Sequence, residues 1–425
     1  MSNPAWPTIP LSKLTFRIGD GIHGTPIYTD GEGYPFINGN NLKSGSIEIT
    51  TDTKFVTIEE YKKHFIEFNK QTLFLSINGT LGNLAKYKGE KMVLGKSAAY
   101  IKCSGIDVDF LYYYLQLKEV KALMWNIATG STIKNLSLAS IRNLDIPTPP
   151  DDLAKKIAGV LSTIDKKIEL NNRINAELET MAKTLYDYWF VQFDFPDANG
   201  KPYRTSGGRM VYNEILKRDV PDGWGAESVL AVSDLLGGGT PAKTKPEYWH
   251  GTIPFFTPSD SDDNIFALAT EDYISEEGLK KSSTRLFEKN TIFITARGSV
   301  GRLALNAVPM AMNQSCYALR PKKGISYSFL YFLTKELIHH LEVKASGSVF
   351  NSIVSNDIEF TNLGLPKHTK IIEDFARIAE PIFQKIEVNT VENIQLSSLR
   401  DWLLPMLMNG QITVRSPIKS EAEMA

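Results

Sequence analysis

The chain has 425 residues, of which 42% are hydrophobic, and its formal net charge is −1. This length predicts two to four domains with sizeable cores. The near-zero charge does not favour a uniformly basic nucleic-acid-binding protein, so any contact with nucleic acid must rest on local patches.

Compartment and membrane signals point to an ordinary intracellular protein. Cys103 and Cys316 form neither a disulfide framework nor a metal-ligand spacing, and a reducing cytoplasm is the simplest compartment. The apolar runs are too short to span a bilayer, and the start MSNPAWPTIP lacks a signal-peptide pattern. We therefore expect a cytoplasmic protein without a membrane segment.

Residues 1–149 are expected to form a globular α+β domain. Short strand-like runs separated by Gly/Asn turns lie at 35–38, 45–50, 71–77 and 92–103. Residues 110–125 have a helical pattern of apolar side chains. Together these elements predict a mixed or curled sheet that carries a few helices.

Three polar loops of this domain are candidates for contact with DNA. The loop NGTLGN at 78–83 is rich in glycine, which permits tight turning, and asparagine pairs well with adenine in the major groove. The loops NGNNLK at 38–43 and ATGSTIK at 128–134 are also polar, and small residues of the second kind often contact phosphates. A solvated hairpin tip, an ordinary turn and a connector are the competing interpretations. The candidate residues are Asn38, Asn40, Asn41, Lys43, Asn78, Thr80, Asn83, Ser131 and Lys134.

A local basic patch follows the glycine-rich loop. Lys86, Lys88 and Lys91, with Lys96 nearby, would supply salt-dependent affinity for the DNA backbone. A merely solvated face is the competing interpretation, because the matching segment later in the chain is almost uncharged.

A long helix is expected at 150–195. The segment 151–190 has no proline and would be roughly 60 Å long as an unbroken helix. Apolar residues recur in alternating steps of four and three, and such a heptad seam requires a partner helix. The seam residues are Ile157, Leu161, Ile164, Ile168, Leu178, Ala182, Leu185 and Trp189.

Two asparagines interrupt this seam at its centre. Asn171 and Asn175 occupy seam positions, where buried asparagine costs stability but fixes register and partner. The alternative is that the helix bends and both side chains face water.

The second half of the chain repeats this plan. Residues 196–217 are expected to form a connecting loop, 218–366 a second globular domain, 367–410 a second long helix and 411–425 a flexible tail. Pro381 should kink or interrupt this helix, because proline removes a backbone hydrogen bond. Its seam is expected at Ile371, Phe375, Ile378, Ile382, Ile386, Leu396, Leu399 and Leu403.

An internal duplication explains this repetition. TLFLSINGTLGNLA at 72–85 matches TIFITARGSVGRLA at 291–304, an offset of 291 − 72 = 219, and KIELN at 167–171 matches KIEVN at 385–389. A repeat this long implies two similar domains related by a pseudo-two-fold. If the axis crosses the helices, they pair antiparallel as a spacer, which suits a bipartite DNA site, although other two-fold partners would suit it too.

The second copy supplies its own candidate residues for DNA contact. Arginine replaces asparagine at both ends of the glycine-rich loop, and arginine pairs well with guanine. The candidates are Thr257, Ser259, Arg297, Ser299, Arg302, Asn313, Gln314, Ser348 and Asn351.

Catalytic and cofactor motifs are missing from the sequence. There is no Asn-Pro-Pro-Tyr type motif for amino methylation, and the segment 89–97 has five residues between its glycines where a phosphate loop requires four. His339 and His340 are adjacent on an expected helix and do not face one ligand. We therefore expect no catalytic centre, no metal and no cofactor.

Several motifs resemble a known family. YWFVQFDFP at 188–196, GKPY at 200–203, SGG at 206–208 and PDGW at 221–224 resemble the central connecting region of type I restriction–modification specificity subunits. RDWLLP at 400–405, followed by Asn409-Gly410, resembles the C-terminal ending of that family. The resemblance covers roughly residues 5–412.

This resemblance implies a fold and a set of partners. Each globular part would be a target recognition domain for one half of a split DNA sequence, and the two helices would form an antiparallel coiled coil that sets the gap. The subunit would carry two methyltransferase subunits, which use S-adenosylmethionine, and ATP-driven restriction subunits, with magnesium also on the partners. The difference between the two glycine-rich loops implies unequal half-sites.

Two questions stay open at this point. Tyr186, Tyr188, Trp189 and Trp402 belong either to the core or to a docking surface for the methyltransferase. A coiled-coil adaptor that binds only proteins and a stand-alone enzyme are the alternatives to DNA readout.

Overall fold

The computed structural model describes residues 6–30, 32–262, 264–344 and 352–414. The chain divides into two compact units, Met1–Lys167 with Gln395–Ala425 and Ile168–Ile394. Both boundaries fall inside long helices, so each unit contains one globular part and a stretch of both helices. The predicted flexible tail at 411–425 lies mostly outside the described residues.

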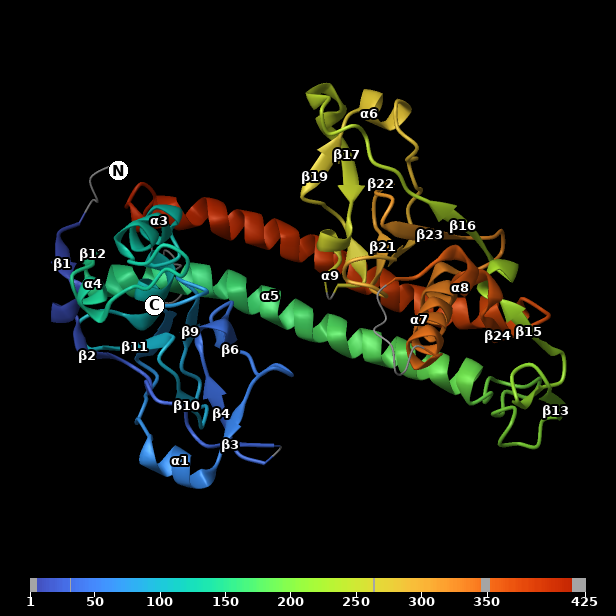
Figure 1. Ribbon diagram of the computed structural model, residues 1–425, viewed down its shortest axis with the longest axis horizontal. Helices are drawn as coiled ribbons and strands as arrows, with labels where there is room; N and C mark the ends of the chain where they lie inside the picture. Colours follow the sequence, from blue (N-terminus) through green and yellow to red (C-terminus); the bar gives the residue numbers. More distant parts are fainter. Residues whose placement is uncertain (1–5, 31, 263, 345–351, 415–425) are drawn as a thin grey trace, which may run out of the picture. The chain divides into compact units, whose positions relative to one another are not determined.

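An antiparallel sheet forms the centre of the first unit (Figure 1). Its strand order is β2 (Thr15–Asp20), β11 (Ala98–Cys103), β8 (Thr72–Ser76) and β9 (Leu84–Lys86). Every residue of β8 is buried, because both faces of this sheet are covered. Leu73 and Leu75 pack on the side of the helices, whereas Phe74 packs toward a second sheet.

The second sheet of this unit is small and mixed. Its order is β10 (Val93–Leu94), β4 (Tyr34–Ile37), β7 (Phe55–Val56) and β3 (Tyr28–Thr29), with β10 parallel to β4. Two strand pairs complete the unit: β1 (Thr8–Pro10) with β12 (Asp145–Pro147), and β5 (Leu42–Lys43) with β6 (Ser46–Ile47). The expected sheet is therefore split into two layers.

The described residues of the first unit include four short α-helices. They are α1 (Ile58–Lys63), α2 (Val108–Tyr114), α3 (Lys118–Ile127) and α4 (Leu138–Arg142). The helix expected at 110–125 is thus two helices, because Leu117 leaves the helical conformation at the start of α3.

The second unit repeats this architecture. Its central sheet has the order β16 (Ser233–Gly237), β23 (Cys316–Pro321), β20 (Ile292–Thr295), β21 (Leu303–Asn306) and β18 (Phe266–Ala267). Its second sheet has the order β19 (Asp272–Ile274), β17 (Trp249–Phe256) and β22 (Ala311–Met312). The pair β15 (Trp224–Ser228) and β24 (Asn362–Pro366) corresponds to β1 and β12.

Its helices correspond as well. They are α6 (Glu276–Lys280), α7 (Tyr327–Lys344) and α8 (Ser355–Phe360), where the single α7 replaces α2 and α3. The connector 196–217, expected to be a loop, contains β13 (Met210–Asn213), which pairs with β14 (Arg218–Pro221).

The strand register confirms the duplication. Phe74 pairs with Tyr100 between β8 and β11, and Phe293 pairs with Ala318 between β20 and β23. Phe36 lies opposite Val93 in one parallel pair, and Phe255 lies opposite Ala311 in the other. The same spacing thus produces the same pairing in both copies.

Both expected long helices are present. The first, α5, spans Asp151–Tyr186 and ends in a π-helical turn at Asp187–Val191, a few residues before the expected end. The second, α9, spans Lys370–Met408 and stays helical across Pro381. The proline does not interrupt it because buried Ala379 and Phe383 on either side hold the helix against the core.

The helices pair antiparallel within the second unit through a polar layer. Asn171 is 1% exposed, and its Nδ2 donates to Glu392 Oε2 at 2.8 Å and to Asn393 Oδ1 at 2.9 Å. One turn further along α5, Asn175 Oδ1 accepts from Asn389 Nδ2 at 2.8 Å. Rising numbers on α5 meet falling numbers on α9, and the seam asparagines face the partner helix rather than water.

The expected seam of α9 is partly wrong. Ile378 is 48% exposed and Leu399 is 44% exposed, although both were assigned to the seam. The buried face of α9 in the second unit is instead formed by Ile372, Phe375, Ala379, Phe383 and Ile386. The helix packs against the globular part as well as against α5, and this second contact rotates the buried face away from a single seam.

The four aromatic residues near the helix ends divide into two kinds. Tyr186 and Trp189 are buried in the core of the second unit. Tyr188 and Trp402 are exposed. Among the residues that the structure describes, no helix is long and apolar enough to cross a membrane.

We predict that Asn171→Ala destabilises the second unit. The change removes two hydrogen bonds that a buried side chain makes to Glu392 and Asn393, and losing such bonds costs about 1–3 kcal/mol. Arg173→Ala, at an exposed position two residues along the same helix, is the matched control. Urea denaturation measures both, and equal midpoints for the two variants would contradict a stabilising role for the polar layer.

Candidate nucleic-acid interface

Two of the polar loops of the first unit meet beside the central sheet. The loop at 38–43 begins with a 3-10 turn at Gly39–Asn41, and Gly39 N donates to Ser97 Oγ at 2.9 Å. Ser97 Oγ in turn donates to Asn38 Oδ1 at 2.9 Å. A Cβ on Gly39 would lie 2.2 Å from Ser76 Oγ, so this close approach to the end of β8 requires glycine.

The third loop joins the same surface. Leu136 N donates to Ile77 O at 2.9 Å, and Asn78 and Asn135 form an isolated bridge. Ile77 N donates to Ser97 O at 2.9 Å. The segments 38–43, 76–83, 95–98 and 128–136 therefore form one continuous surface, called here the first loop surface.

The glycine-rich turn has the expected backbone. Gly79 and Gly82 have φ angles of 74° and 91°, in the left-handed region that favours glycine. Gly82 N donates a hydrogen bond to the backbone oxygen of Ser76 at 2.9 Å, and this bond closes the turn directly after β8. The sequence argument for tight turning at this loop is confirmed.

The second unit has the same hydrogen bonds at the equivalent positions. Ala296 N donates to Ser315 O at 2.8 Å, and Ile353 N donates to Ala296 O at 2.9 Å. Gly301 N donates to Thr295 O at 2.9 Å, as Gly82 N does to Ser76 O. The segments 257–260, 295–302, 313–315 and 352–353 form the second loop surface. The candidates Ser348 and Asn351 lie outside the described residues.

The candidate side chains differ in their access to solvent. Those exposed on the first loop surface are Asn40, Lys43, Thr80 and Ser131, and those exposed on the second are Ser259, Arg297, Ser299, Arg302 and Gln314. Half-buried candidates are Asn38, Asn78, Asn83, Lys134, Thr257 and Asn313.

Asn41 does not fit its expected role. It is 3% exposed, and its Nδ2 donates to Glu48 O and to Thr53 Oγ1, both at 2.9 Å. Its Oδ1 accepts from Asn38 N at 2.9 Å. The side chain is therefore used to shape the loop, and its burial does not support the contact with DNA that the sequence predicted.

The equivalent residue of the second unit has the same structural role. Asp260 Oδ2 accepts from Thr257 N at 2.7 Å, and Asp260 Oδ1 accepts from Glu271 N at 2.8 Å. Both loops thus depend on one acidic or amide side chain that closes the turn.

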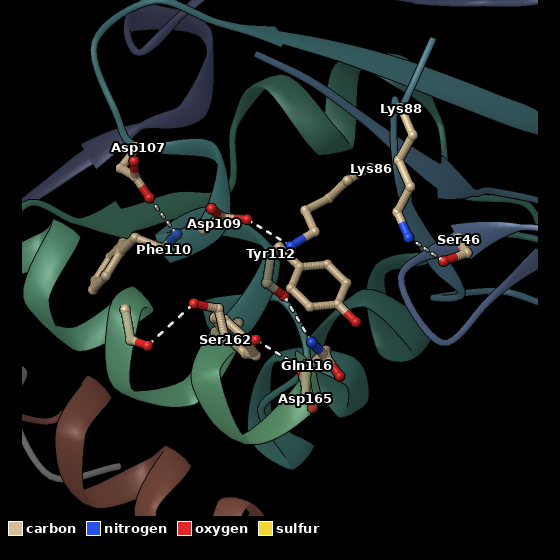
Figure 2. Close-up of polar contacts among 12 residues, drawn as sticks. Ser46, Lys86, Lys88, Asp107, Asp109, Phe110, Tyr112, Gln116, Ser162 and Asp165 are labelled. Atoms are coloured by element: carbon tan, nitrogen blue, oxygen red, sulfur yellow. Dashed lines mark hydrogen bonds and ion pairs between the residues drawn. The ribbon is translucent and has the colours of Figure 1, made fainter. Parts of the chain in front are cut away.

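The lysine patch is partly neutralised (Figure 2). Lys86 Nζ lies 2.6 Å from Asp109 Oδ1 and 4.9 Å from the centre of the Tyr112 ring. It therefore ties the end of β9 to α2, and its expected contact with DNA is not supported. Lys88 Nζ donates to Ser46 Oγ at 2.9 Å, whereas Lys91 and Lys96 are exposed.

Two other basic candidates also have partners within their units. Arg302 Nη1 donates to Ser261 O at 2.8 Å, and Lys134 Nζ donates to Ala128 O at 3.4 Å. Arg297 N donates a hydrogen bond to Ser315 O, which fixes the backbone of the loop, while the Arg297 side chain is exposed. On the second loop surface, Arg297 is therefore better placed than Arg302 to reach a ligand.

Cysteine and metal chemistry find little support in the described part of the chain. Burial raises the pKa of both Cys103 and Cys316 to about 12, so each stays a protonated thiol near neutral pH. The described ranges hold no group of three or more His, Cys, Asp or Glu placed to bind a metal. The loop surfaces offer hydrogen-bond donors and acceptors, which is the chemistry of recognition.

Sequence reasoning missed Ser97 and Ser315. Each accepts a backbone bond from the glycine-rich loop, and Ser97 also ties down the loop at 38–43. The duplication was the available signal, because the two serines stand at equivalent positions of the two copies.

Asn40 and Asn41 provide a matched pair of variants. We predict that Asn41→Ala lowers the free energy of unfolding by about 1–3 kcal/mol, because Glu48 O and Asn38 N lose buried partners. Asn40→Ala, at an exposed position, should leave stability unchanged within ~0.5 kcal/mol. Denaturant unfolding of both variants tests this, and equal losses would refute the structural role of Asn41.

Comparison with known proteins places these surfaces in a family. Residues 24–180 and 221–397 both match the model described as the type I restriction modification DNA specificity domain. The MjaIX specificity subunit of Methanocaldococcus jannaschii is 27% identical over 355 residues, covering 82% of this chain and 79% of that protein. The HindI specificity subunit of Haemophilus influenzae is 25% identical over 357 residues, covering 72% and 77%.

A solved structure shares the fold along the whole chain. The crystal structure of a type I restriction–modification S subunit from M. genitalium superimposes with a TM-score of 0.58 at 17% identity, and the match covers 98% of each chain. With two family matches that together span most of the sequence, the chain belongs to the type I restriction–modification specificity subunit family.

Proposed function

We propose that this chain is the DNA-specificity subunit of a type I restriction–modification complex and that each loop surface recognises one half of a bipartite target. The target recognition domains would be residues 1–149 and 218–366. The observation that carries this proposal is the shared backbone framework of the two loop surfaces, on which different side chains are displayed.

The chemistry of the side chains that flank the two glycine-rich loops fits base recognition. Arginine forms two hydrogen bonds with guanine and asparagine forms two with adenine, and each such pair discriminates by about 1–3 kcal/mol. Asn78 and Asn83 flank the first glycine-rich loop, and Arg297 and Arg302 flank the second. We therefore propose two unequal half-sites.

The helices α5 and α9 would set the gap between the half-sites and dock the partner subunits. Their antiparallel pairing through Asn171 and Asn175 supports a fixed register. The exposed aromatics Tyr188 and Trp402 are candidates for docking a methyltransferase subunit. Two such subunits are proposed, together with restriction subunits.

Catalysis would lie on those partners rather than on this chain. S-adenosylmethionine would be bound by the methyltransferase subunits, and ATP with magnesium by the restriction subunits. We propose that the assembled complex acts on DNA in the cytoplasm.

Selection from random duplex DNA tests the proposal. The chain would be purified with its methyltransferase subunits, incubated with the library and its bound DNA sequenced. Enrichment of a bipartite consensus with two unequal halves is expected. Absence of any enriched sequence would instead favour a coiled-coil adaptor that binds only proteins.

Arg297→Ala should relax specificity in one half-site only. The exposed guanidinium lies on the second loop surface, and loss of a bidentate base contact costs about 1–3 kcal/mol at one position. Arg320→Ala is the control, because Arg320 is paired with Asp234 on β16 and belongs to neither loop surface. The same selection measures both variants, and a uniform loss over all sequences would mark Arg297 as a phosphate contact.

Shortening both helices by seven residues should change the gap and nothing else. Seven residues are two helical turns, so the faces of α5 and α9 keep their pairing while each helix loses about 10 Å. The preferred gap should shorten with both half-sites unchanged. Altered half-sites would refute the spacer role of the helices.

A further inference from the structure

In each unit, an equivalent helical segment of the globular part packs against the long helices. The side chains at these two contacts differ in polarity. FLYYYLQL at 110–117 in the first unit is equivalent to FLYFLTKE at 329–336 in the second. The positions of α5 and α9 that these segments contact are called here the first seat and the second seat. Two sets of facing positions, one of three residues and one of two, differ in polarity between the seats, and they differ in opposite directions.

A polar contact occupies the first seat. Tyr113 is buried, and its hydroxyl donates to Asp165 Oδ2 at 2.6 Å. The other carboxylate oxygen of Asp165 accepts from Arg400 Nη1 at 2.9 Å, which joins both long helices to the globular part. Burial and this bond to Asp165 raise the pKa of Tyr113, so the hydroxyl keeps the proton that it donates.

The equivalent positions of the second seat are apolar. Phe332 stands where Tyr113 does, Phe383 where Asp165 does, and Ala182 where Arg400 does. The rings of Phe332 and Phe383 meet edge to face, with centroids 5.6 Å apart. Ala182 is fully buried, in the same hydrophobic core as Phe383.

A second pair of positions shows the opposite exchange. In the second unit Tyr186 donates its hydroxyl to Glu336 Oε2 at 2.9 Å. Burial raises the pKa of both groups. In the first unit the equivalent residues, Leu404 and Leu117, are both buried in the same apolar core. In each seat, polar side chains therefore face polar ones and apolar side chains face apolar ones. The polar contact, however, lies at different equivalent positions in the two units.

We infer that the buried side chains of each globular part are complementary to its own seat only, so that the two parts cannot be exchanged within this chain. This complementarity is called keying here. On the first seat, Glu336 would face Leu404 and its carboxylate would lose its donor, while Phe332 would leave Asp165 without the Tyr113 hydroxyl. Buried polar groups without partners destabilise a fold, more so when charged. If the proposed function holds, keying fixes the order in which the two half-sites are read.

Variants of the full-length chain test this inference without DNA. Asp165→Phe alone should lower the thermal unfolding midpoint by about 4 °C or more, because it removes the partner of Tyr113 and Arg400 and adds a ring without space. The triple variant Tyr113→Phe, Asp165→Phe, Arg400→Ala installs the complete second-seat set and should recover most of that loss. A triple variant as unstable as the sum of its single changes would overturn keying.

Folding failure is informative in this design. If Asp165→Phe does not fold and the triple variant does, keying is supported; if neither folds, keying is overturned. The reverse set, Tyr186→Leu with Glu336→Leu, repeats the test in the second unit, where the double variant should be more stable than Tyr186→Leu alone. Amide hydrogen exchange of α2 and α7 assigns each effect to its own unit.

A chimaera addresses exchange directly. The segment 225–366 would replace 8–147, either on the present first seat or on a seat carrying Asp165→Phe, Arg400→Ala and Leu404→Tyr. The matched chimaera should unfold at a higher temperature than the mismatched one, and equal midpoints would overturn keying. Because this readout is stability, a failure of the proposed DNA recognition would leave its outcome unchanged.

Discussion

A layer of amide side chains in the middle of an apolar helix pair is the constraint on which much of this fold depends. Asn171 and Asn175 on α5 form hydrogen bonds with Glu392, Asn393, Asn389 and Thr390 on α9. A shift of either helix would break these hydrogen bonds, whereas purely apolar contacts tolerate sliding. The layer therefore holds the antiparallel register in the second unit, and the bond between Asp165 and Arg400 joins the same two helices in the first.

In both loop surfaces, the groups that hold the shape of the loops differ from the side chains that are exposed to solvent. Their shape is held mainly by backbone hydrogen bonds, such as those from Ile77 to Ser97 and from Ala296 to Ser315, which do not depend on the exposed side chains. Side chains that hold the shape of the loops, such as Asn41 and Asp260, are turned inward. This division allows the exposed residues to change without loss of the fold.

The seats show how two copies of one fold have become distinct. A buried tyrosine–carboxylate contact in one unit stands where two phenylalanine rings meet in the other, and the reverse exchange occurs at a neighbouring position. Each change is tolerable only with its partner, because buried polar atoms need hydrogen bonds and buried rings need space. Such paired changes are readily visible here because the duplication supplies its own internal comparison.

The sequence by itself determined what is local or self-similar. The duplication, the two long helices, the glycine-rich turns and the seam asparagines follow from spacing and residue type, and all of them are found in the structure. The family followed from short motifs such as YWFVQFDFP, which the comparisons support. These features need little knowledge of what lies across space.

Only the tertiary structure decided which side chains are free to act. Three features depend on partners that neither helical periodicity nor a sequence motif reveals. They are the buried face of α9, the inward orientation of Asn41 and the ion pair between Lys86 and Asp109. A polar residue in a loop looks the same in the sequence whether it faces solvent or satisfies a backbone group. Contacts between segments distant in the sequence settle that difference, because hydrogen bonds and packing act over a few ångströms of space rather than along the chain.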